Sequence, residues 1–224
     1  REGSYPATFD ARAGHHTGDP VSGAWPTFME FNLSNACNLQ CIQCNGDLSS
    51  SIRIHREHRA PLAPAYGDDF FDDLGAFLPH LHQVQFAGGE PFLGAENFRA
   101  WDLIAEMAPT LPVTVVTNAT QWNPRVEAVL ERLDVSFVFS LDGVTEATYE
   151  AIRVGADIDA VLANVDRFCD YARRRGTTVM INHCLMVQNV HEFGLLLQFA
   201  DRRDIPVNVS VVHHPGHCSI ARLP

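Results

Sequence analysis

The amino-acid sequence predicts an α/β fold, a partial (β/α)6 TIM-like barrel of parallel strands with outer helices. Two observations predict it. Between residues 27 and 215, short apolar segments alternate six times with amphipathic segments, and this alternation is typical of parallel β-α units. Each apolar segment also ends in a polar or glycine-rich group, as strands do where their loops form a binding face. Six units are fewer than the eight of a closed barrel.

The strands are predicted from short runs rich in β-branched and aromatic residues that are bounded by turn-forming residues. They cover residues 27–33, 84–87, 113–116, 135–139, 178–186 and 207–212. The helices are predicted from apolar residues that recur at the 3.6-residue period. They cover residues 68–81, 96–107, 123–133, 157–175 and 189–203.

Several helices have recognisable ends. Asn123 and Pro124 supply a cap and a first-turn proline, and the helix 157–175 finishes with three arginines before Gly176. In the last helix, the side chains expected to face the core are Phe193, Leu196, Leu197 and Ala200. The segment 45–65 has no periodic pattern, and a loop of this length inside a compact domain is usually functional.

Composition limits the classes of function. Sixteen basic and 27 acidic residues give a formal net charge of −11, which disfavours a broad surface for nucleic acid or anionic membranes. No segment is apolar enough to span a bilayer, and the polar N-terminus has no signal-peptide core. Six cysteines, half of them on one loop, fit a reducing cytoplasm better than a disulfide framework. We therefore expect a cytoplasmic protein without nucleic-acid or membrane partners.

Three regions are predicted along the chain. Residues 1–26 are a polar, weakly ordered lead-in, residues 27–215 form the core domain, and residues 216–224 begin a C-terminal extension. Cys218 lies in this extension, and a single cysteine there cannot hold a metal cluster. Cys169, on the apolar side of its helix, is expected to be a core thiol. Cys184 is expected either to be structural or to face the mouth.

The most informative motif is the cysteine loop that follows the first strand. Cys37, Cys41 and Cys44 have the spacing C-x3-C-x2-C, and three thiols cannot all pair with one another as disulfides. Three soft ligands on a short loop are suited to a metal or an iron–sulfur cluster. A closed structural zinc site needs four protein ligands, so three leave one metal position free. The alternative is zinc, with His15, His55 or His58 as the fourth ligand.

Polar residues also follow the other strands. They are Gly88-Gly89-Glu90-Pro91, Thr117-Asn118-Ala119-Thr120, Ser140-Leu141-Asp142-Gly143, Asn182-His183-Cys184 and His213-His214. In parallel α/β folds, ligands bind at the carboxyl ends of the strands, so we expect these groups to meet at one mouth. Two glycines after a strand permit close backbone approach, although a tight turn would also explain them. Residues 53–59, rich in Arg and His, either steer an acidic substrate or form a solvated loop.

The C-x3-C-x2-C motif after the first strand and the G-G-E-P motif after the second resemble the radical S-adenosylmethionine (SAM) superfamily. The S-L-D-G motif, followed by Tyr149 to Arg153, resembles its SPASM/Twitch subgroup of peptide and sulfatase maturases. The resemblance covers residues 27 to about 215. One departure is Gln43, at a position that is often aromatic in the superfamily.

The resemblance implies a role for each matching residue. Cys37, Cys41 and Cys44 would ligate three irons of a [4Fe–4S] cluster, and the fourth iron would bind SAM. Residues implied to contact SAM are Gly88, Gly89, Glu90 and Pro91 near the methionine amino group, Ser140 and Arg153 near the carboxylate or ribose, Asn118 and Asp142 along the same pocket, and Asn182 and His213 near the ribose or adenine.

The resemblance also implies the chemistry and the partners. Reductive cleavage of SAM would yield a 5′-deoxyadenosyl radical that abstracts hydrogen from the substrate, while the protein positions the substrate and excludes water. The electron would come from an external donor such as flavodoxin or ferredoxin. The subgroup implies a ribosomally made peptide as substrate, with a small molecule or cofactor precursor as the alternative. A zinc-stabilised α/β binding module without catalysis is the contrasting class.

Overall fold

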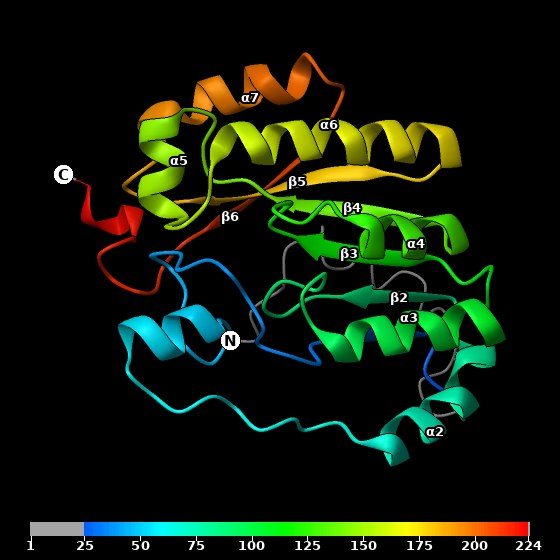
Figure 1. Cartoon of the computed structure of the whole chain (residues 1–224). Coiled ribbons are helices and arrows are strands. Elements are labelled where there is room, and N and C mark those ends of the chain that lie inside the picture. The colour runs from blue at the N-terminus through cyan, green and yellow to red at the C-terminus, as the bar shows by residue number, and fades with distance from the viewer. Residues whose placement is uncertain (1–24, 224) are drawn as a thin grey trace, which may run out of the picture.

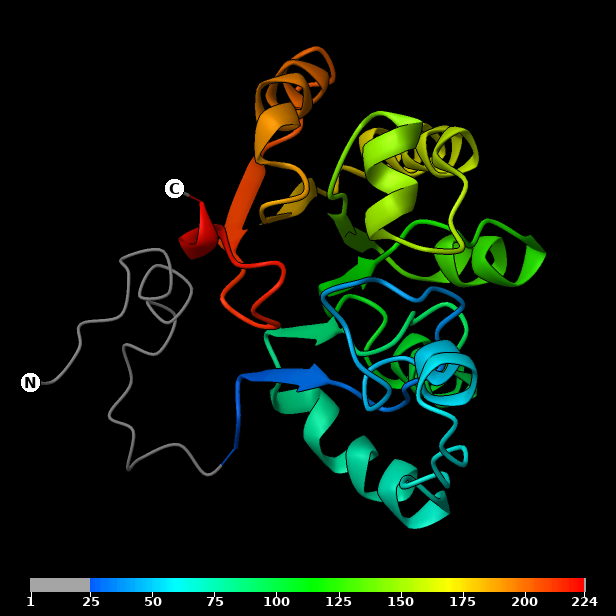
Figure 2. The same cartoon turned by 90° about the vertical axis from the view of Figure 1, so that its left-hand side faces the viewer.

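Six parallel strands in chain order form one curved sheet, β1-β2-β3-β4-β5-β6 (Figure 1). The computed structural model describes residues 25–223. The strands are β1 (Phe28–Phe31), β2 (Gln83–Phe86), β3 (Val113–Thr117), β4 (Val135–Ser140), β5 (Val179–Leu185) and β6 (Val207–Val211). Figure 2 shows them in an arc, with the helices on its outer side. The predicted partial barrel of six parallel units is therefore confirmed.

The helices alternate with the strands as predicted. They are α2 (Asp68–Phe77), α3 (Ala95–Met107), α4 (Pro124–Arg132), α5 (Glu146–Ile152), α6 (Ile158–Arg175) and α7 (Phe193–Asp201), with short turns η1 (Ile52–Arg56), η2 (Leu78–His80), η3 (Val190–Glu192) and η4 (Ile220–Arg222). Asn123 caps α4, because its side chain accepts hydrogen bonds from the backbone N–H groups of residues 125 and 126. Gly176 ends α6 with a left-handed backbone.

The core lies between the sheet and its helices. On the outer face of the sheet, alternate residues such as Val115 and Phe137 are buried, while the residues between them on β3 and β4 are partly exposed. Phe168 of α6 packs against the rings of Phe137 and Phe139. Burial of such large side chains contributes roughly 1.5–3 kcal/mol each to stability. The sheet therefore has a dry outer face and a solvated concave face.

Three local differences separate the structure from the sequence prediction. Residues 52–56 form a π-helical turn inside the segment 45–65 that was predicted to be a loop. Residues 146–152 form α5, which is short and is capped by the Thr145 side chain; no helix is predicted there. Leu197 was expected in the core but is 42% exposed, and Phe199 is buried instead. The first turn of the predicted helix is the 3-10 turn η3, which shifts the helical period.

The predicted lead-in, residues 1–26, lies almost entirely outside the described residues. Within residues 25–223, none of the helices is long and apolar enough to cross a membrane.

Candidate active site

The cysteine loop, residues 37–44, lies at the carboxyl end of β1 and is fixed to a distant part of the chain. The backbone N–H of Gln40 donates to the carbonyl oxygen of Val154 at 2.9 Å, and that of Ile42 donates to Ile152 at 2.9 Å. Within the loop, the N–H of Cys44 donates to the carbonyl oxygen of Cys41 at 3.1 Å. The C-terminal end of α5 thus serves as a backbone template for the three cysteines.

Serines before the π-helical turn η1 hold the loop from its other side. The Ser50 hydroxyl accepts a hydrogen bond from the N–H of Cys37 at 3.1 Å and donates to the carbonyl oxygen of the same residue at 3.2 Å. The Ser49 hydroxyl donates to the carbonyl oxygen of Leu39 at 2.7 Å. These bonds satisfy backbone groups that regular structure leaves free.

Arg56, in the last turn of η1, completes this support. Its guanidinium donates to three carbonyl oxygens of the cysteine loop, those of Gln40, Cys41 and Cys44. Arg53 is buried, with an ion pair to Asp47 at 3.0 Å. The sequence suggested that residues 53–59 are a solvated loop or a substrate-steering patch. In the structure, Arg53 and Arg56 of this segment form bonds to other residues of the protein.

The three cysteines are free thiols in a partly buried environment. Burial raises the pKa of Cys41 to about 11, although the positive charge of Arg153 opposes the rise. Burial also raises the pKa of Cys37 and Cys44. N–H donors approach two of the sulfur atoms: Asn118 Nδ2 lies 3.9 Å from Cys37 Sγ, and Arg153 Nη1 lies 3.9 Å from Cys41 Sγ. Such donors stabilise thiolates when a metal replaces the protons.

The loop after β2 packs directly on the cysteine loop. Gly88 and Gly89 have positive φ angles of 75° and 54°. A Cβ atom on Gly89 would lie 2.4 Å from the carbonyl oxygen of Ala36, the neighbour of the first cysteine. The N–H of Glu90 donates to that same oxygen at 2.7 Å. The two glycines therefore permit a backbone approach that no other residue type allows.

The Glu90 carboxylate is buried and joins two strand ends. It accepts hydrogen bonds from the N–H of Phe92 at 3.1 Å, the hydroxyl of Thr117 at 2.9 Å and the N–H of Asn118 at 2.7 Å. Burial raises the pKa of Glu90 to about 7, against the lowering effect of these donors. Its side chain therefore positions the loop after β3 relative to the loop after β2.

Asp142, directly after β4, connects four segments of the site. Its carboxylate forms a buried ion pair with Arg153 at 2.7 Å and accepts hydrogen bonds from Gln43 Nε2 at 2.8 Å and the N–H of Cys184 at 2.8 Å. The negative charge of Asp142 raises the pKa of Arg153, although burial opposes this. Gln43, which departs from the family pattern, is thus held by a residue of another candidate motif.

The remaining candidates lie around this centre at different distances. Ser140 and Asn182 are in register on β4 and β5, and Asn182 accepts hydrogen bonds from Asn208 and Ser210 of β6. Pro91 is buried, and its carbonyl oxygen accepts a hydrogen bond from Asn97. His213 is exposed beyond β6, and within the described chain its side chain bonds to no other candidate residue. Hydrogen bonds and strand register thus link most of the predicted residues to one another, and His213 takes no part in these links within residues 25–223.

The chemistry of the donor set suits an iron–sulfur cluster, because three free thiols stand on one short loop. In residues 25–223, no group of three His, Cys, Asp or Glu side chains is found in the arrangement of a single-metal site. His55 and His58 are exposed, and His15 lies outside the described residues. A cluster instead takes one thiolate per iron, which three separate thiols on one loop can provide.

The other cysteines are not part of this loop. Cys169 packs against the core, as predicted, and Cys218 is fully buried with Ile152 and Met186. Cys184 contacts the same small cluster, and its N–H bonds to Asp142. Cys184 is partly exposed on the concave face beside Asp142, which favours the expectation that it faces the mouth.

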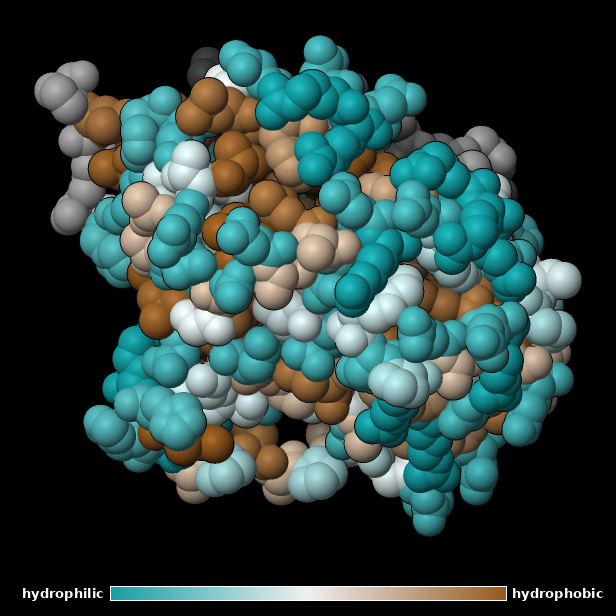
Figure 3. Space-filling model, turned by 45° about the horizontal axis from the view of Figure 1, so that its top comes forward, coloured by the Kyte–Doolittle hydropathy of each residue, from teal (hydrophilic) through white to brown (hydrophobic). Residues whose placement is uncertain are grey.

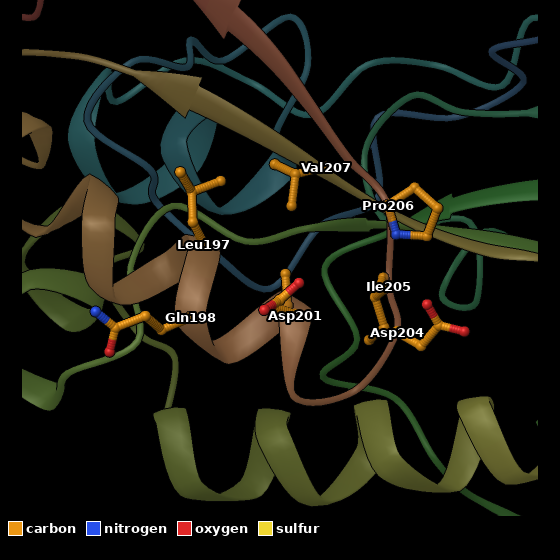
Figure 4. A pocket seen from close by; sticks show the side chains of 8 residues that line it. Leu197, Gln198, Asp201, Asp204, Ile205, Pro206 and Val207 are labelled. Atoms are coloured by element: carbon orange, nitrogen blue, oxygen red, sulfur yellow. The ribbon is translucent and has the colours of Figure 1, made fainter.

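A cavity of about 530 Å³ lies elsewhere, between α7 and the start of β6 (Figure 4). It is lined by Leu197, Asp201 and Ile205 among others, and none of the candidate site residues borders it. The face of the molecule that includes α6 and α7 is mostly hydrophilic, with hydrophobic side chains in patches (Figure 3). The cavity is therefore separate from the cysteine loop.

The residues that support the cysteine loop are not indicated by any sequence pattern. Ser49, Ser50 and Arg56 contact the cysteine loop from a segment without periodicity, so no pattern indicated their positions. Thr117 was part of a noted motif, but its bond to Glu90 joins side chains 27 residues apart. Polar residues close in sequence to a ligand motif were the one available signal.

Two curated proteins are similar to this chain in sequence. The curated mycofactocin maturase MftC of Mycobacterium ulcerans (strain Agy99) is 32% identical over 195 residues, which cover 85% of this chain and 48% of the relative. A GTP 3′,8-cyclase of Caulobacter vibrioides is 25% identical over 193 residues, which cover 82% of this chain and 51% of the relative. The chain thus spans about half the length of these relatives.

Solved structures share the fold. SuiB of Streptococcus suis bound to S-adenosylmethionine matches with a TM-score of 0.66 and 17% identity, over 98% of this chain and 50% of SuiB. SuiB bound to precursor peptide SuiA matches with a TM-score of 0.65 and 18% identity, over 96% of this chain and 45% of SuiB. The family model for the radical SAM superfamily matches residues 31–200. This family uses a [4Fe–4S] cluster and SAM, and with three cysteines, the glycine loop and the six-stranded half-barrel in place, the chain belongs to the radical SAM superfamily.

Proposed function

We propose that this chain is the core of a radical SAM enzyme that modifies a ribosomally made peptide. The observation that supports it best is the cysteine loop, whose three free thiols are fixed by the backbone of residues 152 and 154. The bound groups would supply one-electron cleavage of SAM and a carbon radical able to abstract hydrogen. The chain's own residues would bind and orient the substrate and would exclude water from it.

We assign the roles as follows. Cys37, Cys41 and Cys44 would hold the [4Fe–4S] cluster, which would supply the electron for cleavage of SAM. The backbone of Gly88 to Pro91 would bind the methionine amino group of SAM, because the glycines let it pack directly against the cysteine loop. Arg153 pairs with Asp142 through Nη2, and its Nη1 lies 3.9 Å from Cys41 Sγ. Its positive charge would therefore balance the negative charge of the cysteine thiolates. Residues for the SAM carboxylate, ribose and adenine come from Ser140, Asn118, Asp142, Asn182 and His213.

The proposal of a peptide substrate is supported by the similar proteins. One is a mycofactocin maturase, and SuiB has been solved with a precursor peptide. A small-molecule substrate is the second candidate, because the GTP 3′,8-cyclases are also similar. The free thiols suit a reducing cytoplasm, where flavodoxin or ferredoxin would deliver the electron.

Anaerobic reconstitution with iron and sulfide tests the enzyme. We expect about four irons per chain and conversion of SAM to 5′-deoxyadenosine after reduction by dithionite. Cys41→Ala removes both, whereas the control Cys169→Ala keeps both, since Cys169 lies in the core away from the loop. A colourless protein that retains one zinc ion would refute the proposal.

The substrate is tested separately on the same enzyme. A short peptide encoded beside the gene is incubated with SAM and reductant, and its mass is measured. A defined mass change supports the peptide, while conversion of GTP in a parallel reaction would favour the small-molecule candidate instead.

A further inference from the structure

Two N–H groups from distant parts of the chain approach two of the three cysteine sulfurs. Asn118 Nδ2 lies 3.9 Å from Cys37 Sγ. Arg153 Nη1 lies at the same distance from Cys41 Sγ. Asn118 directly follows β3, and Arg153 directly follows α5. Among the described residues, no N–H group donates to the sulfur of Cys44, whose own thiol donates to a backbone carbonyl oxygen at 3.7 Å. The environment of the three sulfurs is therefore unequal.

The hydrogen bonds of Asn118 fix which end of its amide group faces the sulfur. Its oxygen accepts a hydrogen bond from the N–H of Thr120 at 2.9 Å and another from the hydroxyl of Thr120 at 2.7 Å. Because a backbone N–H can only donate, the amide oxygen must face Thr120. The amino group then faces Cys37, and it also donates to Asn38 Oδ1 at 3.2 Å. Asn118 is thus a neutral donor that is held in one orientation.

Arg153 is held in place by the carboxylate of Asp142. The ion pair joins Arg153 Nη2 to Asp142 Oδ2 at 2.7 Å, and both side chains are buried. The same oxygen accepts a hydrogen bond from Gln43 Nε2 at 2.8 Å, and the other oxygen accepts one from the N–H of Cys184 at 2.8 Å. A carboxylate bonded to three donors fixes the guanidinium, so Nη1 stays directed at Cys41. Arg153 adds a full positive charge to its hydrogen bond.

Both contacts favour a sulfur atom that carries more negative charge. When an iron–sulfur cluster gains an electron, part of the added charge resides on its sulfur ligands, so an N–H group on such a ligand stabilises the reduced form more than the oxidised form. Net charge, hydrogen bonds to sulfur and solvent exposure are among the factors that set the reduction potential of a cluster. Cys41 is buried, and a buried environment strengthens such contacts. The two N–H donors should therefore raise the potential.

We propose that Asn118 and Arg153 set the reduction potential of the cluster that the three cysteines hold. The cluster gains one electron, an external one-electron donor loses it, and no covalent bond changes in this step. The inference rests on the proposed function, because it needs a four-iron cluster on the cysteine loop. Both residues act through a cysteine sulfur, so they are positioning residues that make the reduced cluster accessible to the donor.

A potentiometric titration of the reconstituted protein tests the inference. The titration is anaerobic, at one fixed pH and without SAM, so contacts of either residue with SAM do not contribute. The reduced cluster is followed by its electron paramagnetic resonance signal against the applied potential. Because only chains that hold a cluster give this signal, incomplete loading lowers its intensity and leaves the midpoint potential unchanged.

Variants of Asn118 test the neutral donor. Asn118→Asp keeps the oxygen that faces Thr120 and removes the amino group. At the wild-type midpoint, the ratio of reduced to oxidised cluster should fall about tenfold, which is about 59 mV for a one-electron couple. Asn38→Asp is the matched control, because it makes the same change next to Cys37 on an exposed side chain that bonds to Thr120 and to no sulfur among the described residues. It should show the smaller shift of the added charge alone. Asn118→Ala removes the donor without added charge and should also lower the midpoint.

Arg153→Lys tests the charged donor. Lysine keeps the positive charge on Asp142 but has no second N–H arm that could reach Cys41 at the same time. We expect the ratio of reduced to oxidised cluster to fall about tenfold here as well. Arg53→Lys is the matched control, because Arg53 is also buried and paired with an aspartate, Asp47, and its printed bonds are to oxygen atoms. It should keep the wild-type midpoint.

The outcomes separate this inference from the proposed function. Midpoints of Asn118→Ala and Arg153→Lys that equal those of the wild type and the controls would overturn the inference. Variants that take up no cluster, measured as iron per chain on the same samples, would give both residues a structural role and would overturn it too. A wild type without a four-iron cluster is a failure of the proposed function, whereas a loaded wild type with unshifted variants is a failure of this inference alone.

Discussion

Replacing Gly89 by alanine should disrupt the fold and the metal site together. The backbone φ at Gly89 is 54°, and a residue with a Cβ pays roughly 1–2 kcal/mol in this left-handed region. The new Cβ would also lie 2.4 Å from the carbonyl oxygen of Ala36 and 2.9 Å from the carbonyl carbon of Asn35. Both are backbone atoms, so relief requires movement of the chain that leads into Cys37. Overpacking of this kind costs about 1–3 kcal/mol.

The total loss for Gly89→Ala is therefore about 2–5 kcal/mol in the free energy of unfolding, with fewer irons retained after reconstitution. Urea unfolding and iron analysis measure the two effects. Gly176→Ala is the matched control, because φ there is 69° but nothing lies within 4 Å of the added Cβ. It should lose only the backbone contribution and keep a full complement of iron. Equal stability and equal iron in the two variants would refute the steric reasoning.

Three further predictions concern the same site. Arg56→Gln removes three hydrogen bonds that Arg56 donates to the cysteine loop. A chelator should therefore remove iron faster from the variant than from the wild type, and the free energy of unfolding should fall by about 1–2 kcal/mol. Iron release at the wild-type rate would contradict the role of Arg56. Asp142→Asn leaves the buried Arg153 cation unpaired and should cost about 3–5 kcal/mol in urea unfolding, and a loss near zero would show that the pair is dispensable. The pKa of Glu90 is about 7 in the folded state and its ordinary value is 4.5, so between these pH values the folded chain binds more protons than the unfolded chain. Stability should fall as pH rises through this window, by up to about 3 kcal/mol, and Glu90→Gln should flatten that slope between pH 5 and 8; an identical slope in the variant would remove Glu90 as its source.

The fold was predictable because local patterns repeat. Apolar strands and amphipathic helices have different periods, so their alternation predicted both the element types and the parallel sheet. The prediction was wrong where the local signal was weak. Leu197 has the right spacing for a core residue, yet the 3-10 turn before α7 rotates it to the surface. The helix α5 has too few residues to show a period.

The candidate site was predictable in part for a different reason. The cysteines and the glycines are closely spaced in the sequence, so each group forms a motif that can be recognised without a structure. Their partners are dispersed: Asp142 meets Gln43 from 99 positions away, and Arg153 approaches Cys41 from 112 positions away. No propensity predicts such pairs, because they depend on how the strand ends converge. Arg56 was missed since an arginine in a non-periodic segment looks the same whether it is solvated or bonded.

The backbone pairing of the cysteine loop with residues 152 and 154 also has a consequence for biosynthesis. A ribosome delivers the three cysteines early, yet the two hydrogen bonds that shape their loop require the end of α5, which emerges much later. Until then the three thiols lack the two hydrogen bonds that fix their loop. The loop can take its final form only after the fourth strand and the helix that follows it have left the ribosome. We therefore expect the cluster to be inserted after this part of the chain has folded.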